Sequence, residues 1–411
     1  MRLADSPAEA VWRQEVRAFI THELPGELRR GAGAQMREDE AAGGTAAMRG
    51  GEGYQQAGGA LGAWRQKIVQ RGWLAPAWPK EWGGSGLSVM EQFILNQEFA
   101  EAGAPHPGGR GVTHLGPTLI THGTPEQQAR FLGAILRGET QWCQGFSEPG
   151  AGSDLASLQT RAVRDGDDFV INGQKIWTSG AHRANWMFML ARTDPEAPKH
   201  RGISYFLLDM TTPGITIQPL INMAGNAGFN QVFFDNVRVP AGNVVGEVNR
   251  GWYVGTTTLD FERSGIGSAV GTRKTVERLI RRAKENVANG ISTLGRNREV
   301  RLELADRHVE AMTLMMLSYR VVSLQNAGKV PNYEASMAKL YFSELEQRIT
   351  RTAMKVVGMY GMLYDTQSPR APFRASYARG YLGSIAATIG GGTSEVQRNI
   401  IATRGLGLPH D

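Results

Sequence analysis

The feature that most constrains this chain is that the spacing of its apolar residues changes twice along 411 residues. From Val11 to about Arg137 the spacing is typical of helices, and between Thr140 and Gly246 it changes to alternation. After Gly251 it is helical again. Alternation predicts strands, because successive side chains of a strand point to opposite faces of a sheet. The sequence therefore predicts a helical part, a β part and a second helical part, in that order.

Local signals support this order. The segment "TPEQQARFLGAILRG" opens with Thr124, which is a good helix cap, followed by Pro125, which fits the first helical turn. In the β part, "DDFVINGQKIWTS" carries Asn172 and Gly173 between short apolar runs. An Asn-Gly pair in this position predicts a tight hairpin turn.

Long helical patterns follow at residues 254–288, 298–327 and 333–357, each longer than an average globular helix. Short breaks join them, which favours an antiparallel four-helix bundle closed by the helix after Thr393.

We therefore expect an α+β fold with three domains. An N-terminal α domain is predicted at residues 1–138, a small middle β domain at 139–249, and a C-terminal four-helix-bundle α domain at 250–411.

Composition excludes several classes of protein. Hydrophobic residues make up 41% and charged residues 20%, as in globular proteins, and the single cysteine, Cys143, excludes disulfides within the chain and favours a reducing compartment. No signal peptide or run of 18 apolar residues is present, so we expect a cytoplasmic protein without a membrane span. The sequence contains neither a cysteine cluster nor a His-Glu-x-x-His motif, so we predict no metal site.

The net charge of +6 is modest, and no aromatic residues are interleaved with the basic ones, so we expect no nucleic-acid binding. The basic segment at residues 272–285 is interpreted as a solvated helix face, with docking of a polyanionic ligand or partner as the alternative.

The segment "GFSEPGAGSDLASLQTRAVRDGDDFVINGQKIWTSGAHRANW", Gly145 to Trp186, closely resembles the flavin-binding β domain of the acyl-CoA dehydrogenase family. "GWLAPAWPKEWGGSGLS" before it, and "FDNVRVPAGNVVGEVNRGW" and "GGGTSEVQRNIIATRGLGLP" after it, extend the resemblance over almost the whole chain. A joint match in this order is specific, whereas a single glycine run is weak. The resemblance implies FAD as cofactor, an acyl-CoA thioester as substrate and an electron-transfer flavoprotein as electron acceptor.

The resemblance also assigns cofactor-binding residues. A flavin ring needs an aromatic wall and hydrogen-bond donors at fixed places. By resemblance, one set of residues lines the isoalloxazine, a second approaches it from another side, and a third belongs to the glycine-rich loop. The first set is Gln144, Phe146 and Ser147, and the second is Trp177 and Ser179. The third set is Gly392, Thr393 and Glu395. The alternative for Phe146 and Trp177 is that both are core aromatics.

The catalytic base of many family members is a glutamate two residues before the Thr of a Gly-Thr-Ser element, a position that is Gly391 in this chain. Glu262 offers a replacement, because it lies on the apolar stripe of a predicted helix between Leu259 and Ile266. Burial raises the pKa of a carboxylic acid toward the range of a general base. The pair Glu262-Arg263 also matches the branch that includes isovaleryl-CoA and long-chain dehydrogenases, which carry the base at this position. A structural ion pair is the alternative role.

Gly391 retains a backbone N–H, which in the family hydrogen-bonds the thioester carbonyl. The missing side chain also leaves space, from which we expect a branched or bulky acyl group. By family position, Ser153, Asp260 and Arg263 lie near the CoA moiety, with a solvated surface as the alternative.

Two family elements are altered. The Arg-x-x-Phe-Gly element is not found in "ISTLGRNREVRLELAD", and Gln-x-x-Gly-Gly-x-Gly appears as "KVVGMYG", with Lys355 and Met359 at two of its positions. A homotetramer or homodimer is expected, with a heterotetramer as the alternative. Two other functions stay open: a flavin monooxygenase or nitroalkane-oxidising enzyme on the same fold, and a non-catalytic subunit of a heteromeric acyl-CoA dehydrogenase.

Overall fold

The computed structural model describes residues 4–29, 59–260, 265–288 and 294–409. Contacts divide these residues into two compact units, each with its own hydrophobic core. The helical unit consists of residues 4–29, 87–105, 265–288 and 294–409. The sheet unit consists of residues 59–86 and 106–260. Each unit thus combines segments that are distant in the sequence. The domain boundaries expected after residues 138 and 249 remain a prediction.

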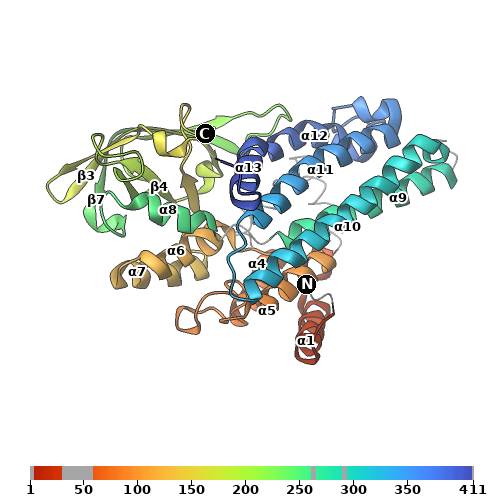
Figure 1. Cartoon of the computed structure of the whole chain (residues 1–411), viewed down its shortest axis with the longest axis horizontal. Helices are drawn as coiled ribbons and strands as arrows, with labels where there is room; N and C mark the ends of the chain where they lie inside the picture. Colours follow the sequence, from red (N-terminus) through yellow and green to blue (C-terminus); the bar gives the residue numbers. More distant parts are fainter. Residues whose placement is uncertain (1–3, 30–58, 261–264, 289–293, 410–411) are drawn as a thin grey trace. The chain divides into compact units, whose positions relative to one another are not determined.

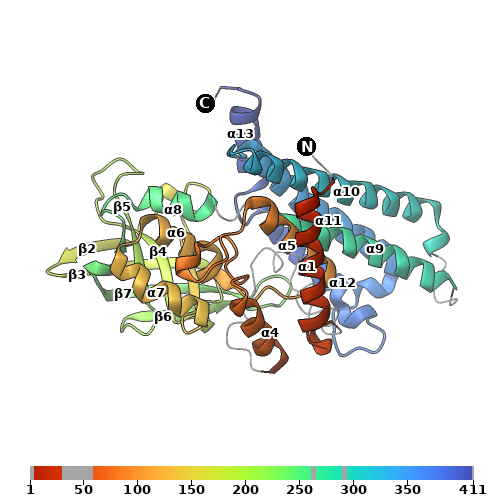
Figure 2. The same cartoon turned by 90° about the horizontal axis from the view of Figure 1, so that it is seen from below.

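Helices form the helical unit (Figures 1 and 2). They are α1 (Pro7–Glu23), α5 (Val89–Ala102), α9 (Ile266–Ala288), α10 (Arg298–Asn326), α11 (Tyr333–Val357), α12 (Ser376–Gly383) and α13 (Ser394–Ile400). Helices α5, α9, α10 and α11 share one core, to which they contribute Phe93, Val270, Leu314 and Leu345. The helices predicted near residues 298–327 and 333–357 are therefore confirmed as α10 and α11.

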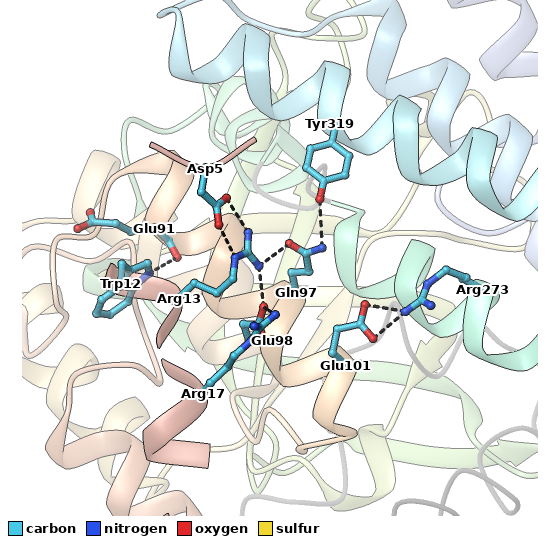
Figure 3. Close-up of polar contacts among 10 residues, drawn as sticks. All are labelled: Asp5, Trp12, Arg13, Arg17, Glu91, Gln97, Glu98, Glu101, Arg273 and Tyr319. Carbon is cyan, nitrogen blue, oxygen red and sulfur yellow. Dashed lines mark hydrogen bonds and ion pairs between the residues drawn. The ribbon is translucent and has the colours of Figure 1, made fainter. Parts of the chain in front are cut away.

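Polar contacts tie α5 to its neighbours (Figure 3). The Glu98 carboxylate is only 5% exposed and accepts hydrogen bonds from Arg13 at 2.6 Å and from Arg17 at 2.7 Å, both of which come from α1. The neighbouring Gln97 also contacts α10, because its Nε2 donates to Oη of Tyr319 at 3.1 Å. The other contacts drawn are Trp12–Glu91, Arg13–Asp5, Arg13–Gln97 and Glu101–Arg273. Charged groups therefore help to attach α1 to α5, together with the buried apolar residues Val16, Phe19 and Ile20 of α1.

An eight-stranded sheet forms the centre of the sheet unit. Its strands are β1 (Trp142–Gly145), β2 (Arg161–Asp165), β3 (Asp168–Ser179), β4 (Trp186–Arg192), β5 (Ile203–Asp209), β6 (Ile215–Leu220), β7 (Phe229–Pro240) and β8 (Val244–Val245). The spatial order is β6-β7-β3-β2-β4-β5-β8. Strand β1 also pairs with β4, in parallel, so β1 and β2 follow each other along one edge of β4.

The sheet unit also contains helices. They are α4 (Gly59–Gln70), the π-helical turn η2 (Gly111–Leu115), α6 (Gly116–His122), α7 (Pro125–Arg137) and α8 (Gly251–Asp260). Of these, α6, α7 and α8 are drawn beside the strands in Figure 2. The predicted cap of α7 is confirmed, because Oγ1 of Thr124 accepts from the N–H of Gln127 at 3.3 Å. None of the helices in the described part of the chain has the length and apolarity needed to cross a membrane.

Two sequence expectations were wrong. Asn172 and Gly173 do not form a hairpin turn but lie inside β3, where the pairing with β7 shifts register. The hairpin between β2 and β3 turns instead at Gly166, whose φ of +60° supplies the conformation that a two-residue turn needs. The helix expected over residues 254–288 is present as α8 and α9, with Gly265 outside both.

We expect Gly116→Ala to lower the thermal unfolding midpoint. An ideal Cβ at Gly116 would lie 1.7 Å from Cζ2 of Trp78. The Trp78 ring is 2% exposed and donates a hydrogen bond to the Val112 carbonyl, so it has no room to move. Such overpacking destabilises by about 1–3 kcal/mol.

Gly271→Ala is the matched control, because Gly271 is also helical and no heavy atom lies within 4 Å of its added Cβ. Helix propensity predicts a gain of up to about 1 kcal/mol there. Equal midpoints for the two variants in calorimetry would contradict the packing seen around Trp78.

Candidate functional site

The segment after β1 lies against the last residues of β3. The N–H of Ile176 donates to the carbonyl of Ser147 at 2.9 Å. Beside it, Nζ of Lys175 donates to the carbonyl of Phe146 at 3.1 Å. The structure therefore brings Phe146 and Ser147 next to the end of β3 that carries Trp177.

Trp177 is not a core residue. Its side chain is 58% exposed, with one contact to the edge of the Phe229 ring at 6.1 Å between centroids. Its φ is +58°, which is strained for a bulky residue. The pairing of β3 with β7 shifts between Lys175 and Thr178, and such a bulge re-aims the side chain within it. Strain of this kind is concentrated at functional sites.

The other aromatic residue behaves differently. Phe146 is 5% exposed, and its ring packs edge-on against Phe188 and Tyr205. The ring therefore belongs to the core.

A buried ion pair holds these two segments together. Nζ of Lys175, which is 0% exposed, lies 2.7 Å from Oε1 of Glu148. The Glu148 carboxylate also accepts from the N–H groups of Gln159 and Thr160 at 2.6 and 3.0 Å. Lys175 and Glu148 were not identified as functional residues from the sequence.

Two opposing effects determine the pKa values of this pair: burial disfavours the charged form of each group, and attraction between the two charges favours it. For Lys175 burial is the larger effect and lowers the pKa to about 8, although attraction to Glu148 opposes it. For Glu148 burial is again the largest single effect and disfavours the charge. The Lys175 ammonium and the additional hydrogen bonds together outweigh it, so the pKa of Glu148 lies below its usual value. Both groups are therefore charged at neutral pH.

The glycine-rich loop belongs to the helical unit and is fixed from α11. Nζ of Lys339 donates to the carbonyls of Gly392 at 2.6 Å and Ala387 at 3.3 Å. The φ values of Gly391 and Gly392 are +69° and +87°, which favour glycine. No described residue accepts a hydrogen bond from the exposed N–H of Gly391. This donor is available to a ligand.

The remaining predicted residues divide between the two units. In the helical unit, Oγ1 of Thr393 caps α13 by accepting from Val396, and Glu395 is exposed in the first turn. In the sheet unit, Ser153 is exposed and Ser179 is 6% exposed at the end of β3. Asp260 is the last residue of α8. The predicted base Glu262 and its neighbour Arg263 lie outside the described residues.

The sheet unit offers the chemistry that a flavin needs. Trp177 presents an aromatic face, Ser147 and Ser179 carry hydroxyls, and the amide of Gln144 supplies a donor. A metal ion is not supported by the described residues, in which no three His, Cys, Asp or Glu side chains form a cluster.

Comparison with protein families gives three matches that together span most of the chain. The acyl-CoA dehydrogenase N-terminal domain matches residues 52–139, the middle domain 143–237 and the C-terminal domain 249–406.

Known proteins match over the full length. The acyl-CoA dehydrogenase IpdE1 of Mycobacterium tuberculosis is 38% identical, over 97% of this chain and 98% of its own. Among solved structures, the Tcur3481-Tcur3483 steroid ACAD has a TM-score of 0.82 at 35% identity, with 100% of both chains covered. The ChsE4-ChsE5 complex from Mycobacterium tuberculosis has a TM-score of 0.78 at 36% identity, again with 100% coverage of both.

We expect Lys175→Met to lower the free energy of unfolding by about 3–5 kcal/mol near neutral pH, because it leaves a buried carboxylate without its cation. The double variant Lys175→Met/Glu148→Gln should recover most of this loss, since no unpaired charge remains. Arg238→Met is the control, because it removes the exposed Arg238–Asp165 pair. Loss of an exposed pair changes stability by at most about 1 kcal/mol. Denaturant unfolding followed by tryptophan fluorescence measures all three.

The pH dependence of stability has a defined sign for each partner. The lowered pKa of Glu148 stabilises the fold above the usual value of 4.5, and this contribution is lost as the pH falls through the lowered value. The lowered pKa of Lys175 means that the unfolded chain binds more protons between pH values of about 8 and 10.5, so stability rises with pH in that window. An alkaline rise that persists unchanged in Lys175→Met would show that Lys175 is not its source.

Proposed function

Because this chain belongs to the acyl-CoA dehydrogenase family, we propose that it is an FAD-dependent enzyme that oxidises a bulky acyl-CoA thioester to the 2-enoyl-CoA. The observation that carries the proposal is the glycine at position 391, where the loop offers a backbone donor and no acid.

FAD would be held by the residues that the resemblance assigns to it. In the sheet unit these are the side chains of Gln144, Ser147, Trp177 and Ser179 with the backbone of Phe146, and in the helical unit Gly392, Thr393 and Glu395. When bound, FAD supplies the acceptor for the hydride that leaves the β carbon of the substrate.

Glu262 takes the proton from the α carbon in this proposal. Gly391 has no side chain with which to do so, and Glu262 is the acid that the sequence places on an apolar helix stripe. The N–H of Gly391 donates to the thioester carbonyl and stabilises the negative charge that develops there. A preorganised donor of this kind contributes about 3 kcal/mol in other enzymes.

A bulky acyl group agrees with the space at Gly391. An added Cβ there would have the Cε of Lys339, at 3.9 Å, as its nearest heavy atom. The solved structure named as a steroid ACAD supports a polycyclic acyl group as the leading candidate. In this proposal Ser153, Asp260 and Arg263 contact the CoA moiety.

A second chain of the same fold is proposed as a partner, and an electron-transfer flavoprotein as electron acceptor. The ChsE4-ChsE5 complex shows that a related structure is heteromeric. In this chain Lys355 pairs with Glu303 on α10, and Met359 is 83% exposed. Neither residue supplies the Gln or Gly of the family element, which supports completion of the site by another subunit.

We expect Glu262→Gln to slow flavin reduction by an acyl-CoA about 10²–10⁴-fold, the usual contribution of a general base. The measurement is anaerobic mixing of the yellow protein with a panel of straight, branched and polycyclic acyl-CoA esters, following flavin absorbance. Glu247→Gln is the control, because Glu247 is an exposed acid whose replacement should change nothing.

Other outcomes have defined meanings. Reduction of Glu262→Gln at the parental rate excludes Glu262 as the base. Preference for short straight chains contradicts the bulky substrate. A protein that stays colourless with FAD supports the non-catalytic subunit, and one that consumes oxygen while ignoring every ester supports the monooxygenase or nitroalkane-oxidising enzyme.

A further inference from the structure

Arg110 reaches across the sheet unit to β1. It immediately precedes η2, and its Nη1 donates to Oε1 of Gln144 at 2.8 Å, although the two residues are 34 positions apart. A hydrogen bond from a guanidinium is charge-assisted and stronger than one between neutral groups.

Two glycines make this contact geometrically possible. Gly109 has a φ of +68°, which turns the chain just before Arg110. At Gly111, an added Cβ would lie 2.9 Å from Cδ1 of Trp142, so the backbone presses directly on β1. Trp142 and Gln144 are two residues apart on that strand and point to the same face. The Arg110 side chain therefore arrives beside Gln144.

The contact decides how the Gln144 amide is oriented. An amide side chain has an acceptor oxygen and a donor nitrogen that can exchange places by rotation. Because Arg110 can only donate, it selects the orientation in which the oxygen faces the guanidinium. Among the described residues, none accepts a hydrogen bond from the Gln144 amide nitrogen, so that donor is available to a ligand.

A small cavity with a mixed polar and apolar lining lies between this arrangement and the end of β3. Its volume is about 20 Å³, and Arg110, Trp142, Ser179 and Arg183 are among the residues that line it. The indole N–H of Trp142 is buried without a partner in the described residues. Arg110 thus borders both Gln144 and Ser179, which come from different strands.

We propose that Arg110 is a positioning residue for the flavin. It holds Gln144 as a donor toward the ring, and its positive charge stabilises the negative charge that the ring gains on reduction. The proposal rests on the proposed function, since it requires FAD to bind beside Gln144.

The test is the midpoint potential of bound FAD in the holoenzyme, measured without acyl-CoA by enzymatic reduction against a reference dye. We expect Arg110→Met to lower the equilibrium constant for reduction about tenfold, equivalent to about 30 mV for a two-electron couple. Arg110→Lys keeps the charge and should retain a potential close to that of the parent. Arg110→Lys also keeps the proposal testable if Arg110→Met folds poorly. A midpoint potential about 30 mV below that of the parent in Arg110→Lys would show that the positive charge is not what stabilises the reduced flavin.

Two further variants separate the contact from general electrostatics. Arg183→Met removes an exposed arginine that lines the same cavity, and it should leave the potential unchanged. In a Gln144→Ala background, the effect of Arg110→Met should shrink, because part of it acts through the amide. An equal drop for Arg183→Met and Arg110→Met, or an Arg110→Met effect of undiminished size in Gln144→Ala, overturns the proposal.

The failure of this proposal is distinguishable from that of the proposed function. If the parent protein binds no FAD, the proposed function fails. If the parent binds FAD and both Arg110 variants keep its potential and its flavin absorption spectrum, only the role of Arg110 is refuted.

Discussion

The buried ion pair between Lys175 and Glu148 is the interaction on which the proposed flavin-binding residues of the sheet unit depend. It fastens the segment after β1 to the end of β3, so that Ser147 and Trp177 become neighbours. Removing two charges from water is costly, and several hydrogen bonds are needed to offset it. The pair receives them from Phe146, Gln159 and Thr160. A buried charge pair of this kind fixes geometry more clearly than it adds stability.

A lysine that donates hydrogen bonds to backbone carbonyls also occurs in the helical unit. Lys339 fastens the glycine loop through the carbonyls of Ala387 and Gly392, as Lys175 fastens the segment after β1 through that of Phe146. In both places a lysine holds a loop through hydrogen bonds to its backbone. This leaves backbone N–H groups and a strained Trp177 facing outward for a ligand. The proposed chemistry depends on rigid donors rather than on many reactive side chains.

Local sequence signals predicted much of the fold, because helix caps and long apolar stripes act over a few residues. Thr124 and the helices near 298–327 and 333–357 show this. The hairpin turn predicted at Asn172 and Gly173 was wrong because β7 pairs with β3 on both sides of this Asn-Gly pair. Strand pairing of this kind joins residues that are far apart in the sequence, so a local pattern cannot predict it. Lys175 had a usable signal, since it lies an even number of residues from the inward Phe169 and Ile171. Arg110 had none, because its partner Gln144 is distant in sequence.

The most direct test of the central claim is a crystal structure of the protein, with any partner subunit, bound to FAD. The account predicts the isoalloxazine against Trp177, with the amide nitrogen of Gln144 and the hydroxyl of Ser147 within hydrogen-bond distance of the ring. A flavin bound elsewhere, with Trp177 still exposed and the Gln144 amide nitrogen unused, would contradict it.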